Sequence, residues 1–231
     1  MRQIIRKLAV SLALLPIIWL FILDSTAAQS RRACPQLKEP LFFSVTVTPK
    51  NIKYNLRLSQ QQIIRLAKRP LRARPDRGSK TLGLTTVAHV VKSSYQDISY
   101  QIGPNRYCAR LASLELEIKI TDLKVYSLRK YPRGSCQYKA IVDHEHEHVV
   151  TFQNAMKSLE RDFTSKLPRI IEKSPAVIGV SPLQARQTLR RNLNHNIDKI
   201  RNRVLRKMNA RNRQIDTPLS YKRISQKCSK W

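Results

Sequence analysis

Residues 136–167 read CQYKAIVDHEHEHVVTFQNAMKSLERDFTSKL, and their apolar residues recur three and four positions apart. Residues at this spacing share one face of a helix, so the stretch predicts a long amphipathic helix that covers a hydrophobic core. Pro168 predicts the end of this helix, which we place at 135–167. The apolar stripe comprises Tyr138, Ile141, Val142, Val149, Phe152, Met156, Leu159, Phe163 and Leu167.

The predicted helix contains one H-E-x-x-H motif, formed by His144, Glu145 and His148. Histidines four positions apart share a helix face and can bind one Zn²⁺, while the adjacent glutamate can take a proton from a water that the metal activates. Both histidines lie beside the apolar stripe, so we expect their rings to face the protein interior. His146 lies about 200° around the helix from His144 and cannot join the same ligand set. The motif therefore predicts a hydrolytic zinc site with Glu145 as the catalytic base.

The third metal ligand has to come from elsewhere in the chain. The extended H-E-x-x-H-x-x-G-x-x-H motif is absent, because Thr151 and Asn154 occupy its glycine and third histidine positions. We therefore expect an acidic ligand from a later segment. His195 is an alternative ligand, although its position is equally typical of a histidine on the helix surface that binds no metal. The acidic candidates are Asp198, Asp216 and Glu172.

The region before the helix, residues 41–131, is mainly β in its sequence pattern. Alternating apolar and polar residues indicate strands with one wet face, which together with short connections favour an antiparallel sheet. Ser59 and Gln62 are typical of a capping box that begins a short helix. We predict strands at 41–48, 52–58, 84–102 (one strand or a hairpin), 107–120 and 123–131, the last after a turn at Thr121-Asp122.

A second long helix is predicted at 182–213. Leu189, Leu193, Ile197, Ile200, Val204 and Met208 form its apolar stripe, and the remaining face is crowded with Arg and Lys. We expect this stripe to pack on the motif helix. The chain is thus predicted to be α+β, with residues 41–231 forming one domain in which an antiparallel sheet packs against two long helices.

The N-terminus has the pattern of a secretory signal peptide at residues 1–28. A basic start precedes the uncharged run Leu8–Leu23, and Ser25-Thr26-Ala27-Ala28 supplies small residues for cleavage. The alternative is an uncleaved anchor, although sixteen residues are fewer than the roughly 20 that span a bilayer comfortably. Residues 29–40 are predicted to be an exposed lead-in. We expect an exported protein, periplasmic or secreted, with no second membrane segment.

Four cysteines in an exported chain indicate two disulfides. Three pairings are open, and we favour Cys108–Cys136 with Cys34–Cys228. No two cysteines have the spacing of a cysteine-based metal site.

The formal net charge of +29 indicates that the chain is attracted to anionic partners. For an exported protein we expect envelope polymers or lipid head groups as partners, because no helix-turn-helix, zinc-finger or RNA-binding motif accompanies the basic residues.

The motif and its surroundings resemble the DUF922 family of predicted secreted zinc-dependent proteases. The resemblance rests on Gly134–Val149, with support from Thr81–Thr85, Tyr107-Cys108 and Ile215–Tyr221 before Cys228, and together these cover most of residues 34–228. It implies a zincin-like α+β fold, a zinc cofactor and hydrolysis of peptide bonds. In this family many members carry a histidine near the C-terminus, after an aspartate that Asp216 matches; here Tyr221 occupies that place. The third ligand is therefore expected to be Tyr221, Asp216 or His195.

The leading expectation is an exported zinc peptidase that acts on peptide or protein substrates. The alternative is a non-catalytic envelope protein that binds anionic surfaces through its basic C-terminal helix, with any metal structural.

Overall fold

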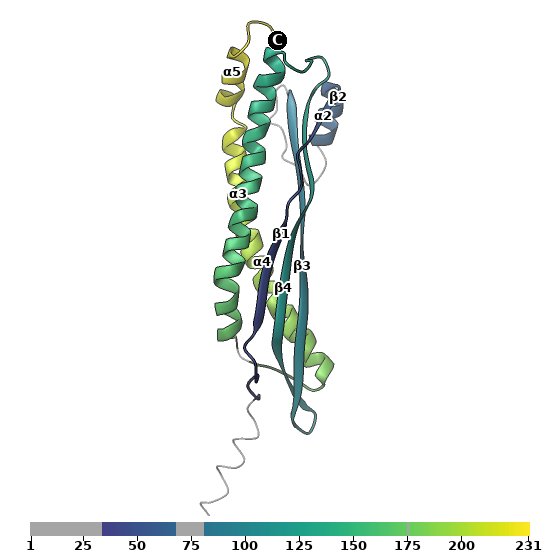
Figure 1. Cartoon of the computed structure of the whole chain (residues 1–231), viewed down its shortest axis with the longest axis vertical. Helices are drawn as coiled ribbons and strands as arrows, with labels where there is room; N and C mark the ends of the chain where they lie inside the picture. Colours follow the sequence, from purple (N-terminus) through teal and green to yellow (C-terminus); the bar gives the residue numbers. More distant parts are fainter. Residues whose placement is uncertain (1–33, 68–80, 175) are drawn as a thin grey trace, which may run out of the picture.

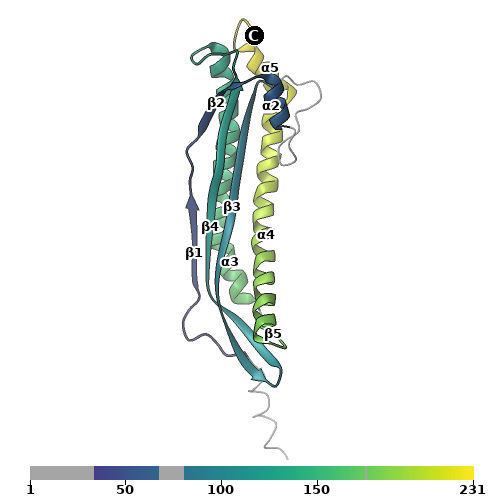
Figure 2. The same ribbon diagram turned by 90° about the vertical axis from the view of Figure 1, so that its right-hand side faces the viewer.

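The computed structural model describes residues 34–67, 81–174 and 176–231. In this part of the chain five strands and four helices form an elongated molecule, in which two long helices lie along one face of a long, narrow sheet (Figures 1 and 2). The α+β class is confirmed. The elements are β1 (Phe42–Thr48), β2 (Lys53–Leu58), α2 (Gln60–Ala67), β3 (Gly83–Gly103), β4 (Arg106–Leu128), α3 (Cys136–Lys173), β5 (Val177–Gly179), α4 (Pro182–Ile215) and α5 (Pro218–Gln226).

The expected all-antiparallel sheet is wrong, because the sheet is mixed. β4 lies at its centre, with antiparallel β3 along one edge and with β5, β1 and β2 in succession along the other. β1 and β2 both run parallel to β4. From Thr48 to Lys53 the chain advances five positions, and their partners Lys119 and Lys124 are also five apart. The short connection is therefore extended, and β2 continues along the edge of β4 where β1 stops. In an antiparallel sheet the chain would have to reverse direction between β1 and β2.

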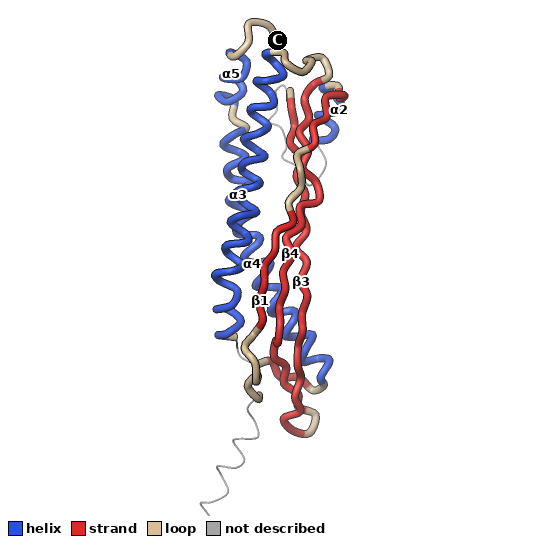
Figure 3. The backbone as a smooth tube through the Cα atoms, viewed as in Figure 1, coloured by secondary structure: helices blue, strands red, loops and turns tan. Residues whose placement is uncertain are grey.

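β3 and β4 are single strands that run nearly the full length of the molecule (Figure 3). The expected turn at Thr121-Asp122 is instead a β-bulge, since Ala88 pairs with Asp122 while His89 pairs with Ile120. Side chains alternate between the faces of a strand, so an uninterrupted β4 would turn Leu123 and Val125 outward. The extra residue restores the phase, and both side chains stay in the core.

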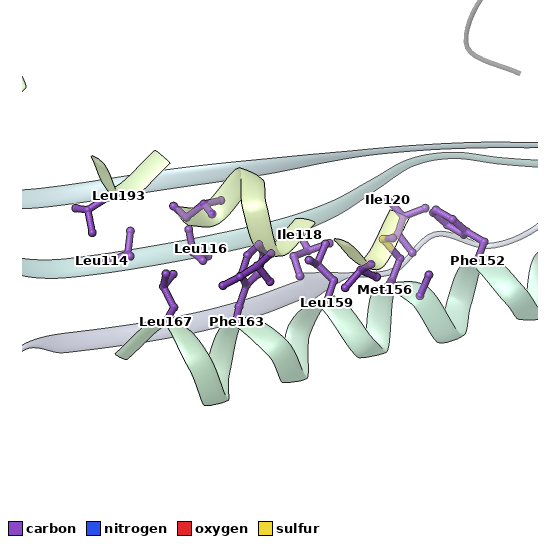
Figure 4. Packing of buried hydrophobic residues seen from close by; sticks show 14 of the residues in the cluster. Leu114, Leu116, Ile118, Ile120, Phe152, Met156, Leu159, Phe163, Leu167 and Leu193 are labelled. Carbon is purple, nitrogen blue, oxygen red and sulfur yellow. The ribbon is translucent and has the colours of Figure 1, made fainter. Parts of the chain in front are cut away.

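The core lies between the inner face of the sheet and the two long helices. Leu114, Leu116 and Ile118 of β4 meet Phe163 and Leu159 of α3 in a layer with almost no exposed surface (Figure 4). The apolar stripe of α4 closes the layer from the side, as the sequence predicted. At one end of the sheet the short helix α2 lies across the strands from α3 (Figure 1), and its Ile63 packs with Tyr126 and Leu128 of β4.

Two helix boundaries differ from expectation. α3 continues past Pro168 to Lys173, and Ile170 and Ile171 beyond the proline pack against the core. A proline inside a helix removes one backbone hydrogen bond, and here packing outweighs that loss. The basic helix ends at Ile215, close to the expected 213, and the short elements β5 and α5 lie in segments for which the sequence pattern indicated no regular structure.

Two disulfides are present, but the favoured pairing is wrong: the bonds are Cys34–Cys108 and Cys136–Cys228. Cys108 lies at the start of β4 and Cys136 follows the end of that strand, so the length of the sheet, on the order of 60 Å, separates them. Each bond therefore closes a different end of the molecule. The predicted signal peptide and most of the lead-in lie outside the described residues. Among the helices that are described, none is both long enough and apolar enough to span a membrane.

Candidate metal centre

His144 and His148 lie one turn apart on α3 and face the end of α4. Their rings are 5.2 Å apart and nearly perpendicular, and only 5% and 12% of their side chains is exposed. The prediction that both rings face the protein interior is confirmed. His146 points away from them and forms a 2.7 Å hydrogen bond with the Tyr54 hydroxyl.

Asp216 is the residue at which α4 ends. It is the C-cap of α4, and Thr217 then caps α5 by accepting a hydrogen bond from the Ser220 amide. Pro218 cannot continue α4, so the chain bends at this point and directs the Asp216 carboxylate toward α3. Its Oδ1 atom lies 3.3 Å from Nε2 of His144 and 3.1 Å from Nε2 of His148.

These three residues could hold a metal ion. Their ligand atoms all lie within 4.8 Å of one another. Two imidazole nitrogens and one carboxylate oxygen form a ligand set used by catalytic zinc sites, which leave a further position for water. The donors therefore fit a divalent transition metal.

Two further side chains orient the ligands. Asn212, one turn before Asp216 on α4, places its Oδ1 3.1 Å from Nδ1 of His148. The ring then donates from Nδ1, which directs Nε2 at the centre. The Tyr221 hydroxyl donates to Oδ1 of Asp216 over 3.0 Å, and its ring lies 5.4 Å from that of His144.

Glu145 lies beside the ligands and is held by β3. The Thr85 hydroxyl donates to its carboxylate over 2.8 Å, and the side chain of Glu145 is 5% exposed. Gly83 permits this approach, since a Cβ atom there would lie 2.6 Å from Oε1 of Glu145. Burial raises the pKa of Glu145, although the nearby charges of His148 and His144 and the Thr85 hydrogen bond oppose the shift. A raised pKa suits a carboxylate that has to accept and return a proton.

Without a metal, His148 and Asp216 form an ion pair. Burial lowers the pKa of His148, but the Asp216 hydrogen bond and the charges of Glu145 and Asp216 outweigh it and raise the pKa to about 9. Burial acts to raise the pKa of Asp216, and its hydrogen bonds to His144 and His148 overcome this and hold the pKa well below its usual range. A metal ion at this point would take the place of the imidazole proton.

The structure brings some predicted site residues together and leaves others apart. Asp216 and Tyr221 both reach the centre, and Tyr221 does so through Asp216. His195 is exposed and precedes Asp216 by about six turns of helix, roughly 30 Å along α4. Asp198 pairs with Arg201, and Glu172 is exposed near the far end of α3.

Asn212, Thr85 and Gly83 have site contacts that the sequence analysis did not assign. Asn212 could have been found from its spacing, because it precedes Asp216 by four positions and residues four apart on a helix share a face. The contact from β3 has no such local signal.

Comparison of the chain with protein-family models, curated proteins and solved structures gives no match.

Proposed function

We propose that this chain is an exported zinc-dependent peptidase with a zincin-like arrangement. The observation that carries the proposal is the convergence of His144, His148 and Asp216 beside the buried carboxylate of Glu145. The H-E-x-x-H spacing and the resemblance to predicted secreted proteases favour a peptide bond as the substrate. The two disulfides fit an oxidising compartment outside the cytosol.

The residues of the centre would have different roles in hydrolysis. Zinc, when bound, supplies a Lewis acid that polarises a carbonyl and lowers the pKa of water. Asn212 and Tyr221 fix the orientation of His148 and Asp216. Glu145 accepts the proton of the attacking water and passes it to the leaving amine, while Thr85 holds the carboxylate in place.

The test compares two neighbouring glutamates. Glu145→Gln keeps the shape of the side chain but cannot accept the proton, whereas Glu147→Gln changes an exposed residue two positions away. We expect the wild type to bind zinc and cleave a peptide library. Glu145→Gln should retain the zinc and lose activity by about 100-fold or more, and Glu147→Gln should retain both. Unchanged cleavage in Glu145→Gln would remove this residue from its role, and failure of the wild type to take up zinc would refute the proposal.

A second candidate function is binding of anionic polymers, favoured by the charge of α4. The helix carries ten Lys and Arg residues against one acid, Asp198. Within the described chain Arg203, Arg206, Lys207 and Arg213 are exposed and form no ion pair, so their charge is free to attract anions. Arg203 and Lys207 also line a groove of about 590 Å³ between α3 and α4, whose opposite wall includes Asp143 and Glu147.

This candidate is tested with inorganic polyphosphate as the probe. Replacing Arg203, Arg206 and Lys207 by Gln should weaken salt-sensitive binding by about tenfold or more while leaving zinc content and cleavage unchanged. Equal binding by the triple variant and the wild type would dismiss α4 as the binding surface.

A further inference from the structure

The end of the molecule that lies farthest from the metal centre carries a group of exposed apolar side chains. We call it the apolar tip and define it by Phe42, Ile98, Ile178, Val180 and Leu183. Their exposed fractions are 57%, 42%, 50%, 66% and 60%. Large hydrophobic side chains this exposed, gathered at one end of a molecule, mark an interaction surface.

Strand register places two members of the tip close together, while Phe42 pairs with Ser113 further along β4. Ile178 of β5 pairs with Cys108, and Ile98 of β3 pairs with Arg110, two positions further along β4. Residues two apart on a strand face the same way, so both isoleucines lie on the outer face of the sheet. Ala109 and Val177, the adjacent residues on β4 and β5, pack in the core on the inner face, which confirms this orientation.

The start of α4 lies at the same end of the molecule, beside β5 on the inner side of the sheet. The backbone of Gly179 lies against that of Ala185, so that an added Cβ would come within 2.7 Å of the Ala185 nitrogen. The Val180 amide donates to the Gln184 side chain over 2.7 Å. These contacts hold Val180 beside the first turn of α4, where Leu183 is exposed.

The N-terminal part of the chain enters the fold at this tip. Cys34 is bonded to Cys108, and its carbonyl accepts a hydrogen bond from Arg110. The uncharged run Leu8–Leu23 ends eleven residues before Cys34, a length of chain that can span at most about 40 Å. Thr85, at the metal centre, pairs with Val125, and the seventeen residues from Cys108 to Val125 correspond to about 55 Å of strand. A membrane that holds this run is therefore close enough to touch the tip, and a molecule that stands upright on it keeps the metal centre about 55 Å further away.

We propose that the apolar tip rests in the surface of a lipid bilayer, to which the run Leu8–Leu23 ties the chain as an uncleaved anchor. Apolar side chains at the tip enter the boundary between head groups and acyl chains, and the cationic chain is attracted to anionic lipid. The molecule then projects from the membrane and carries the metal centre away from it. This inference is independent of the proposed peptidase activity.

The test measures which end of the full chain touches lipid. Trp19 and Trp231 are replaced by Phe, and a single tryptophan is introduced as Leu183→Trp at the tip or, in the matched control, as Leu219→Trp. Leu219 is similarly exposed, at 56%, but lies on α5 near the metal centre. Each protein is reconstituted in vesicles of phosphatidylcholine and phosphatidylglycerol with brominated acyl chains, which quench tryptophan only on contact with the bilayer interior.

We expect the fluorescence of Leu183→Trp to fall at least twofold and that of Leu219→Trp to remain unchanged. Adding Val180→Asp to Leu183→Trp should relieve the quenching, and far-ultraviolet circular dichroism checks that the fold is retained. Quenching at both positions would show that the molecule lies flat, and quenching at neither would show that the tip does not enter the bilayer. Either result overturns the proposal, as does a membrane-extracted protein whose N-terminus begins after residue 23.

Discussion

Metal binding should release a proton from His148, and the reason lies in the two hydrogen bonds of its ring. Nδ1 faces Asn212 Oδ1 and Nε2 faces Asp216 Oδ1, so without a metal both nitrogens have an acceptor. The doubly protonated ring is favoured, and the pKa of His148 is raised to about 9. A metal needs the Nε2 lone pair and has to displace that proton.

The size of the effect can be worked out from the pKa. At pH 7, two units below 9, only about 1% of the metal-free protein has a neutral His148, which weakens metal binding by about 100-fold, or about 2.7 kcal/mol. The apparent zinc affinity should therefore rise about tenfold per pH unit from pH 7 and level off above pH 9. Chelator competition across this range measures the slope. Isothermal calorimetry in buffers of different ionisation enthalpy counts the proton.

A matched pair of variants checks the cause. Asn212→Ala removes the acceptor at Nδ1 and should shift the plateau to lower pH, whereas His146→Gln alters a histidine that lies outside the cluster and should leave the profile unchanged. A zinc affinity that does not change between pH 7 and 9 would refute the reasoning.

The same pKa also determines how the stability of the metal-free protein depends on pH. A group whose pKa is raised on folding stabilises the fold below its unfolded pKa, about 6.5, and this stabilisation disappears as the pH rises through about 9. The melting temperature of the metal-free protein should therefore fall between pH 7 and about 10, and added zinc should reverse the fall.

Three further predictions concern a residue beside the centre, a disulfide near it and a proline at the other end of α3. Gly83→Ala should lower the free energy of unfolding by about 1–3 kcal/mol and reduce cleavage, because the new Cβ would lie 2.6 Å from the Glu145 carboxylate; urea denaturation measures the loss. Replacing Cys136 and Cys228 by Ser should destabilise the protein by about 4–5 kcal/mol, since the bond spans 92 positions, and should weaken zinc binding by loosening α5. Pro168→Ala should raise the melting temperature, because alanine restores the backbone hydrogen bond that proline lacks inside α3.

Controls for these variants lie elsewhere in the fold. Gly103→Ala should be tolerated, since its nearest neighbour would be 3.8 Å from the added Cβ. Removing Cys34–Cys108 should lower stability but leave zinc affinity unchanged, because that bond lies at the opposite end of the sheet. Unchanged stability in Gly83→Ala, unchanged zinc binding without Cys136–Cys228, or a lower melting temperature for Pro168→Ala would contradict the respective explanation.

Local pattern was enough to predict the parts of this molecule that depend on neighbouring residues. The spacing of apolar residues predicted α3 and α4, and the position of His144 and His148 beside the α3 stripe predicted that they face inward. The Ser59–Gln62 capping box was also predicted, and both of its hydrogen bonds are present. Helical spacing and capping act within a few residues, so a linear sequence displays them directly.

The features that local pattern could not predict all depend on where distant segments meet. Both disulfides differ from the favoured pairing. Cys108 lies near the start of β4, and this unbroken strand of 23 residues carries the chain to the other end of the sheet before Cys136. That continuity depends in turn on a bulge whose residues, Thr121-Asp122, are equally suited to a turn.

In the metal centre, too, local pattern predicted some residues and the tertiary structure decided the others. The order of residues was sufficient to place two histidines and a glutamate together on one stretch of α3, because residues four apart on a helix necessarily lie side by side. That Asp216 joins them is known only from the folded molecule, because its position depends on the length of α4, the bend before Pro218 and the packing of α4 on α3. Contacts across 68 positions arise from the folded arrangement of whole elements, which the local spacing of residues does not encode.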